Sequence, residues 1–193
     1  MPADGLNMSA QKQAGVDVEA NRKSQKWTAR EKAARVAWGL ACPLFAWSPR
    51  LFWSWRRQLL RLFGAQIGSE VHIYPSVRVT MPWNLTVGSQ SAIGDRAILY
   101  ALGPITLGSR VTVSQGSHLC AGTHDWRAPD RPLLKPPILI EDDAWICADA
   151  FIGPGVKIGE AAIVGARAVA MKNVPAGSIV VGNPAVELRR SGK

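Results

Sequence analysis

An aliphatic residue returns at every sixth position through much of this chain, and this period limits the fold more than any other feature. The clearest run is Ile140, Ile146, Ile152, Ile158 and Val164. A period of six fits neither an α-helix, with 3.6 residues per turn, nor an isolated strand, with a period of two. It fits a chain that turns a corner every six residues, so that three sides make one coil. Stacked coils bury a continuous aliphatic core, and the period therefore predicts a solenoid.

The same period extends from Ile67 to Val174. Glycine often follows the aliphatic residue, where it relieves a corner with positive φ, and a small or β-branched residue comes four positions after the aliphatic one. Two slips of two residues interrupt the count, and with them the repeat predicts about five coils. The slips precede Val87 and Leu107, and the earlier members of the repeat are Ile67, Ile73, Val79, Leu85, Val87, Ile93, Leu99, Ile105, Leu107, Val113 and Leu119.

Several segments carry the motifs of a known family. They are Ile140 to Ile146, Ile152 to Gly159, Val181 to Ala185, and the stretches 59–64, 81–85 and 114–125. The chain resembles the hexapeptide-repeat acyltransferases, and within them the colanic-acid-type polysaccharide O-acetyltransferases. The resemblance implies an all-β fold, a left-handed parallel β-helix of about five coils with an N-terminal helical extension and an extruded loop. It also implies acetyl-CoA as the acyl donor and assembly as a homotrimer.

Composition excludes several classes of protein. At 193 residues we expect one domain with appendages. The net charge is +9, of which residues 1–66 carry +7 and the rest only +2. A protein whose folded surface follows nucleic acid would carry the basic residues on its body, so we expect no nucleic-acid partner. Three cysteines without paired spacing, no signal-peptide pattern and no apolar run long enough to span a membrane favour a cytoplasmic protein.

The segment before the repeat has a different character. Residues 1–25 are polar and predict disorder. Residues 26–64 form a Trp/Arg-rich arm, in which Thr28 and Glu31 have the spacing of a capping box. The helix that they begin is expected to reach about Ala41 and stop before Pro43, and a second helix is expected from near Arg50 to Gly64.

The arm has two interpretations that are compatible with each other. Tryptophan beside arginine on short amphipathic helices is typical of helices that lie at a membrane surface, so residues 27–63 could give peripheral contact with the inner face of the membrane. Alternatively, the helices cap the open end of the β-helix, which would otherwise expose unpaired strand edges.

The repeat defines the remaining boundaries. We expect the β-helix over residues 65–175 and a tail over 176–193 that holds a short extended piece and a basic end. Within the β-helix the period disappears from Asp125 to Leu139, a stretch rich in proline and basic residues. A long irregular insertion in a regular repeat indicates a function, and in solenoids such insertions belong to the binding face. We therefore expect the active site beside the loop 125–139.

His124 stands at the root of this loop and is the predicted general base. Imidazole titrates near neutral pH and can accept a proton from a sugar hydroxyl as the hydroxyl attacks a thioester. The family resemblance implies a catalytic histidine at this place. The other two histidines, His72 and His118, do not stack with it when coils are counted, so we expect no metal site within one subunit.

The remaining site residues follow from the resemblance, by position. Asn84 and Tyr100 lie in earlier coils and could reach the acceptor. Asp125, next to His124, would either orient the site or simply begin the loop. Acetyl-CoA would lie in a slot between subunits along the last coils, against Trp145, Ala148, Ala166, Arg167, Lys172 and Arg189. Two positions depart from the family pattern, because Cys147 and Arg167 stand where glycine or a small residue is usual. For the acceptor and donor residues named in this paragraph, packing, corner hydrogen bonding or a solvated surface position remain alternative roles.

The leading prediction is an acetyl-CoA-dependent O-acetyltransferase that modifies a sugar of an exopolysaccharide or glycan precursor by direct transfer in a ternary complex. The acceptor could be a glycan or a nucleotide- or lipid-linked sugar. Two alternatives stay open. One is a non-catalytic hexapeptide scaffold that keeps the coils for assembly. The other is a protein like the γ-class carbonic anhydrases, with zinc held between subunits.

Overall fold

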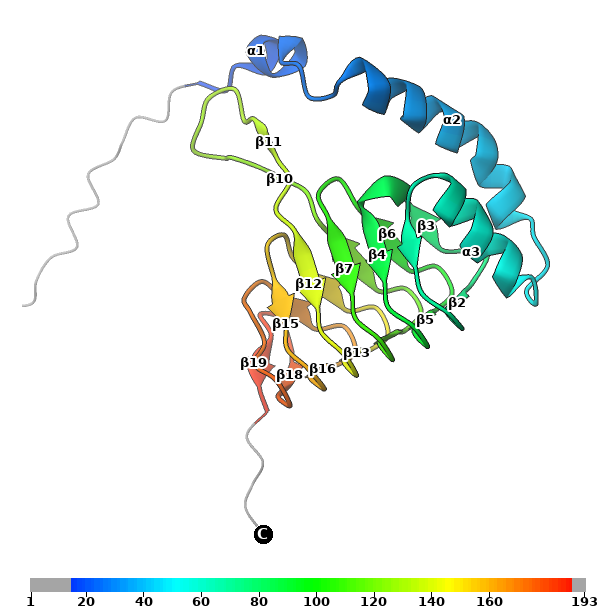
Figure 1. The fold of residues 1–193 in the computed structure, drawn as a ribbon. Coiled ribbons are helices and arrows are strands. Elements are labelled where there is room, and N and C mark those ends of the chain that lie inside the picture. The colour runs from blue at the N-terminus through cyan, green and yellow to red at the C-terminus, as the bar shows by residue number, and fades with distance from the viewer. Residues whose placement is uncertain (1–14, 189–193) are drawn as a thin grey trace, which may run out of the picture.

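The computed structural model describes residues 15–188, and most of them form a three-sided parallel β-helix (Figure 1). Each coil contributes one short strand to each side. The first side, face A, contains β1 (Gln66–Ile67), β4 (Leu85–Val87), β7 (Ile105–Leu107), β12 (Ile138–Ile140) and β15 (Lys157–Ile158). The period of six is confirmed as a coil that turns three corners.

The other two sides are built in the same way. Face B contains β2 (His72–Ile73), β5 (Ala92–Ile93), β8 (Thr112–Val113), β13 (Trp145–Ile146), β16 (Ile163–Val164) and β18 (Ile179–Val181), with β19 (Val186–Glu187) added antiparallel at its edge. Face C contains β3 (Arg78–Val79), β6 (Ile98–Tyr100), β9 (His118–Cys120), β14 (Phe151–Ile152) and β17 (Val169–Ala170). The parallel pairing gives five complete coils, as expected.

Aliphatic residues that share a register stack along the inside of each face. On face A they are Ile67, Val87, Leu107, Ile140 and Ile158, and all five are buried. Removal of these apolar side chains from water supplies most of the favourable free energy of folding. In a solenoid each coil contacts only its neighbours, so this burial takes place between one coil and the next.

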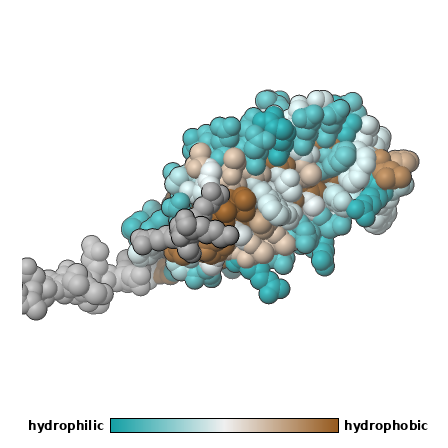
Figure 2. All heavy atoms as spheres, turned by 90° about the horizontal axis from the view of Figure 1, so that it is seen from below, coloured by the Kyte–Doolittle hydropathy of each residue, from teal (hydrophilic) through white to brown (hydrophobic). Residues whose placement is uncertain are grey.

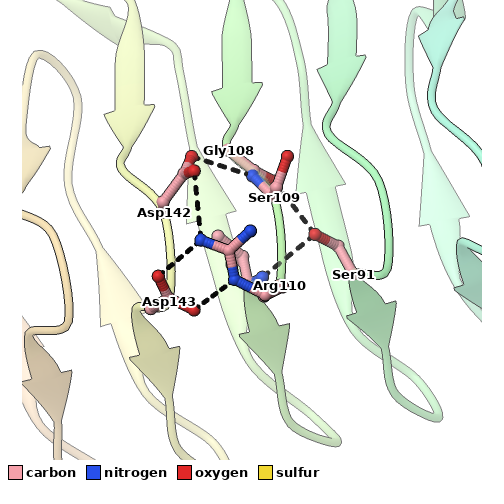
Figure 3. A network of polar contacts seen from close by, with 7 residues as sticks. Ser91, Gly108, Ser109, Arg110, Asp142 and Asp143 are labelled. Carbon is pink, nitrogen blue, oxygen red and sulfur yellow. Dashed lines mark hydrogen bonds and ion pairs between the residues drawn. The ribbon is translucent and has the colours of Figure 1, made fainter.

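The corners need close approach of one coil to the next. A Cβ on Gly88 would fall inside the contact distance of the Gly108 backbone, so only glycine fits there. The expected reason, a positive φ, does not hold for Gly88, because the left-handed residues at these corners are others, such as Gln90 and Arg110. Side chains satisfy corner backbone groups as well: at the corner between faces A and B, the Ser109 amide donates to Asp142 and Ser91 Oγ donates to the Gly108 carbonyl (Figure 3).

The irregular parts of the repeat gather at one corner, the one that joins face C to face A, which we call the C–A corner. Eight positions separate Val79 from Val87, and eight separate Leu99 from Leu107, where a regular side uses six. The first excess forms the 3-10 turn η1 (Pro82–Asn84). In both coils face A begins two residues early, with buried Leu85 and Ile105 inside the strand. This explains the two slips in the period.

The arm caps the first coil, which confirms one of the two interpretations of this segment. The third helix, α3 (Trp53–Leu62), lies over the end of the β-helix (Figure 1). Three of its arginines donate to strand-edge carbonyls that lack a coil above them. Arg56 bonds Ile73, Arg57 bonds Val71, and Arg61 bonds Ile67 and Gly68. The open edge is therefore satisfied by side chains.

Helix boundaries differ from the expected ones in two places. The capping box of Thr28 and Glu31 is present, but α2 (Ala29–Ala46) continues through Pro43. Proline removes one helical hydrogen bond, and the packing of Trp38 and Phe45 against the core holds the helix together beyond it. The next helix begins at Trp53, three residues after the expected start.

The ends also differ from expectation. Part of the segment predicted to be disordered, residues 1–25, forms α1 (Val18–Lys23), which is capped by Asp17 and packs near the hairpin described below. At the other end, β18 and β19 extend face B into the expected tail, so the β-helix continues beyond residue 175. In the described residues, no helix is long and apolar enough to cross a membrane.

Candidate active site

The loop expected after His124 is a β-hairpin. Its strands are β10 (Thr123–His124) and β11 (Leu133–Leu134), which pair antiparallel, with His124 opposite Leu133. The Asp125 amide donates to the Pro132 carbonyl at 3.1 Å. The hairpin leaves the C–A corner after β9 and returns to it at β12, so it is the largest of the three insertions at this corner.

His124 is exposed, and one of its ring nitrogens is held by the hairpin itself. Its Nδ1 lies 2.7 Å from the backbone carbonyl oxygen of Arg131. A carbonyl can only accept, so in the neutral imidazole Nδ1 carries the hydrogen and Nε2 keeps the lone pair. A general base needs a ring nitrogen with a free lone pair. In this tautomer that nitrogen is Nε2, which points away from the Arg131 carbonyl.

Asp125 does not orient this ring. Its Oδ1 accepts a hydrogen bond at 3.0 Å from the amide of Arg127, two residues later. Short side-chain bonds of this kind stabilise turns. Of the two roles left open for Asp125, the contacts support the one in which it begins the loop.

Asn84 and Tyr100 lie on the same corner as His124, in the two preceding coils. The Asn84 amide donates to the carbonyls of Ala101 and Leu102, at 2.9 Å each. Tyr100 ends β6 and is partly exposed, with its carbonyl accepting from the Ala121 amide. The structure thus brings these three predicted residues to one edge of the β-helix, and gives Asn84 a bonding role within the corner.

The other two histidines are elsewhere. His72 is on face B and stacks on Trp53, with ring centroids 4.7 Å apart. His118 is on face C between Tyr100 and Phe151, and burial lowers its pKa. Its Nε2 is buried and has no hydrogen-bond partner within the described residues. Over residues 15–188, no group of three His, Cys, Asp or Glu side chains is placed to hold a metal ion.

Three of the residues predicted to bind the donor lie together on a second edge, the corner between faces B and C, which we call the B–C corner. The Arg167 amide donates to the Ala148 carbonyl at 2.9 Å, and Ala166 precedes Arg167. Arg167 has a φ of 58°, and its guanidinium Nε lies 3.8 Å from the Asp149 carboxylate. Its side chain therefore lies along the corner of the neighbouring coil.

The remaining predicted donor residues are more scattered. Trp145 is on the outside of face B, where its indole N–H donates to Ser114 at 2.9 Å. Lys172 is exposed and follows β17 at the C–A corner. Arg189 lies outside the described residues. Cys147, one of the two departures from the family pattern, is half-buried, and burial raises the pKa of its thiol.

Comparison with known proteins identifies the family. No family model matches the chain. The putative colanic acid biosynthesis acetyltransferase WcaF of Escherichia coli (strain K12) is 45% identical over 152 residues, which cover 79% of this chain and 84% of the relative. A hexapeptide-repeat acetyltransferase from Vibrio cholerae O1 biovar eltor, solved with acetyl coenzyme A, superposes with a TM-score of 0.78 at 25% identity, over 88% of this chain and 93% of that one. The chain belongs to the hexapeptide-repeat acetyltransferases.

This membership settles the coarser predictions. The protein is an acyltransferase with acetyl-CoA as its donor, and its solenoid is the left-handed parallel β-helix of the family. A galactoside acetyltransferase in complex with coenzyme A has the same fold, with a TM-score of 0.79 at 20% identity over 91% of this chain and 89% of that one.

Sequence reasoning missed two participants near His124. One is the Arg131 carbonyl, which belongs to the backbone and leaves no signal in residue type. The other is Asn21, whose side-chain amide reaches the same hairpin from α1. Asn21 falls in the segment predicted to be disordered. The signals for its helix are short-range: Asp17 as a residue type that favours helix N-caps, and Glu19 and Lys23 at i,i+4 spacing.

Proposed function

We propose that this acetyltransferase moves the acetyl group of acetyl-CoA to a hydroxyl group of a sugar in an exopolysaccharide or glycan precursor, with His124 as the general base. The observation that carries the proposal is the hydrogen bond from His124 Nδ1 to the Arg131 carbonyl. It leaves Nε2 free to accept a proton at an exposed corner. The similarity to WcaF, a putative colanic acid biosynthesis acetyltransferase, supports a sugar of a polysaccharide as the acceptor class.

The transfer is direct. Nε2 takes the proton of the acceptor hydroxyl while the hydroxyl oxygen attacks the thioester carbon. The tetrahedral intermediate collapses, the carbon–sulfur bond breaks, and the proton passes from the imidazolium to the leaving thiolate. The Arg131 carbonyl dipole stabilises the imidazolium while the ring holds the proton, because its negative end faces Nδ1–H.

The donor would lie along the B–C corner. Backbone groups of Ala148 and Ala166 would meet the pantetheine arm, and Trp145 would form a wall. Arg167 at this corner and Arg189 are candidates for the phosphates, because guanidinium groups bind phosphate strongly. Lys172 lies at the C–A corner, so its ammonium group could reach the same phosphates only from a neighbouring subunit.

A homotrimer would complete the site. His124 is at the C–A corner, whereas Ala148 and Ala166 are at the B–C corner, and the whole width of face C separates these two edges of one coil. Acetyl-CoA bound at the B–C corner of one subunit could reach His124 only on a neighbouring subunit, whose C–A corner would face that B–C corner. The two-corner arrangement therefore favours an active site shared between subunits.

The base is tested by His124→Ala. We expect nearly complete loss of coenzyme A release with sugar acceptors and little change in melting temperature, since the side chain is exposed. His72→Gln, which changes a histidine on another face, is the control and should stay active. Activity of His124→Ala within a few-fold of wild type would show that another group accepts the proton.

The arm adds a second element to the proposal, peripheral contact with the cytoplasmic face of a membrane. One side of α2 packs Trp38 and Phe45 on the β-helix, and the opposite side carries an outer stripe at helical spacing. The outer stripe consists of Val36 (65% exposed), Leu40 (78%), Leu44 (57%) and Trp47 (85%). The turn after α2 continues it with exposed Leu51 and Phe52, and Figure 2 shows hydrophobic atoms at that tip of the molecule.

Charge favours an anionic lipid surface as the occupant of the outer stripe. Residues 27–63 contain seven Lys/Arg and one Asp/Glu, and exposed Arg30, Lys32 and Arg35 lie on α2 itself. Basic residues beside an apolar stripe are the pattern of helices that bind anionic lipids in the interface plane. A lipid-linked sugar acceptor would then be close to the active site.

Vesicle pelleting tests this contact. The full chain should pellet with phosphatidylcholine–phosphatidylglycerol vesicles more than with phosphatidylcholine alone, and Leu40→Ser/Trp47→Ser should weaken pelleting by about tenfold. The control Trp126→Ser/Leu188→Ser removes the same residue types from exposed sites elsewhere. Deletion of the arm is unsuitable, because the arm caps the first coil. Equal pelleting of all three proteins would contradict membrane contact through the outer stripe.

A further inference from the structure

One backbone carbonyl receives two side chains from different parts of the chain. The Arg131 oxygen accepts from His124 Nδ1 at 2.7 Å and from Asn21 Nδ2 at 2.8 Å. The same Asn21 nitrogen lies 2.6 Å from the Asp130 carbonyl. Asn21 belongs to α1, more than a hundred residues earlier in the chain. A carbonyl oxygen has two lone pairs, so both donors can be accommodated at once.

This carbonyl sits where the β-helix does not fix it. Arg131 lies in the turn of the hairpin, with a φ of 43° in the left-handed region, and the coils reach only the hairpin's base at β9 and β12. Hairpin turns without packing on both sides move easily. The position of the Arg131 carbonyl, which bonds His124 Nδ1, therefore depends on the contacts that other segments make with the turn.

The segment around α1 and the start of the arm hold it at several points. The Asp17 amide donates to the Pro129 carbonyl at 2.9 Å on one side of the turn. On the other side, the Lys135 ammonium lies 3.9 Å from the Trp27 ring centroid and donates to the Lys26 carbonyl at 3.2 Å. Figure 1 shows α1 beside the tip of the hairpin formed by β10 and β11. Among these contacts, the Asn21 amide is the one that reaches the atom bonded to His124.

We propose that Asn21 is a positioning residue for the general base. By donating to the Arg131 and Asp130 carbonyls, it fixes the oxygen that selects the Nδ1–H tautomer of His124. Two regions distant in sequence thus share one hydrogen-bonded unit at the active site. The proposal rests on the proposed role of His124.

Asn21→Ala and Asn21→Asp both remove the amide donors, and aspartate keeps the shape. We expect both to lower kcat by about tenfold, because the ring and its partner then sample unproductive geometries. The KM for acetyl-CoA should stay unchanged, since the donor corner is on another edge. The control is Glu19→Gln/Lys23→Gln, which breaks an exposed ion pair of the same helix and should leave kcat at the wild-type value.

Nitrogen NMR of the imidazole separates positioning from general loss of structure. With neutral His124, the wild-type protein should show a protonated Nδ1 and an unprotonated Nε2, and the Asn21 variants should show a mixture of the two tautomers. A wild-type kcat and tautomer in Asn21→Ala, with His124→Ala inactive, would overturn the positioning role alone. An active His124→Ala would instead refute the proposed base, and the tautomer measurement would still test the contact. Equal loss of kcat in the control would also overturn the proposal.

Discussion

Asn84 offers the sharpest test of whether a residue at the C–A corner binds the acceptor or holds the corner together. Its amide donates two 2.9 Å hydrogen bonds, to Ala101 and Leu102. Asn84→Ala would leave both carbonyls unpaired in a partly buried place. At about 1 kcal/mol for each hydrogen bond, the free energy of unfolding should fall by about 2 kcal/mol. For a chain of this size that corresponds to a melting temperature lower by about 4–8 °C.

The assay is thermal and urea unfolding together with the acceptor KM. Asn84→Asp should cost more than Asn84→Ala, because a carboxylate cannot donate and repels the two carbonyl oxygens. Asn173→Ala is the matched control, since its side chain accepts one bond, from the Lys157 amide, at an exposed site near the same corner. It should cost half as much as Asn84→Ala or less.

One combination of results would refute this reasoning. If Asn84→Ala melts within a degree or so of wild type and only the acceptor KM rises, the two hydrogen bonds contribute nothing measurable to the fold. The residue would then serve the acceptor alone. A loss of stability with an unchanged KM at low temperature would give the corner role without the acceptor role.

Two further predictions concern the cap and the A–B corner. Arg56→Met should lower the free energy of unfolding, measured with urea, by about 3 kcal/mol. The reason is that buried Arg56 donates hydrogen bonds to the carbonyls of Ile73, Pro49 and Arg50 and to the Ser48 hydroxyl. A loss no larger than that caused by Arg30→Met, at an exposed site, would contradict this prediction. The hydrogen bond from Arg110 holds the pKa of Asp143 below its usual value, so its contribution to stability is present above the unfolded pKa and is lost as pH falls through the lower folded pKa. Asp143→Asn should therefore flatten the fall in melting temperature below about pH 4, and an unchanged pH profile would argue against this pair.

The sequence predicts the coils well because each coil repeats the same physical requirement. Every inward position must be aliphatic and every corner must be small, so the period alone places Ile140, Ile146 and Ile152 on three successive faces, as the register confirms. The capping box of α2 is equally local and was predictable. The course of α2 beyond Pro43 was not, because tertiary packing of Phe45 outweighs the local cost of proline.

The candidate site was only partly predictable for the same reason. Residue type and position indicate His124, but its partner is the Arg131 backbone, which any residue could supply. The helix of Asn21 has only one turn and a half and no buried residue of its own. Such a segment has too little apolar surface to predict order, and it is ordered by its contacts with the hairpin.

The insertions in the repeat all fall on one edge, and the hydrogen bonds there connect them in series. Asn84 in the first turn donates to the second turn, 101–104, and the Gly103 amide in that turn donates to the Ala121 carbonyl at the root of the hairpin. The Ile138 amide, where the hairpin returns, donates to the Pro104 carbonyl. The two coils that follow have no such excess: Ile152 and Ile158 keep the spacing of six, and the next return to face A, from Ala170 to Val174, is shorter. In this chain the departures from the strict period bond to one another, and the stacked column of irregular turns marks the edge at which we propose that a base is held outside the core.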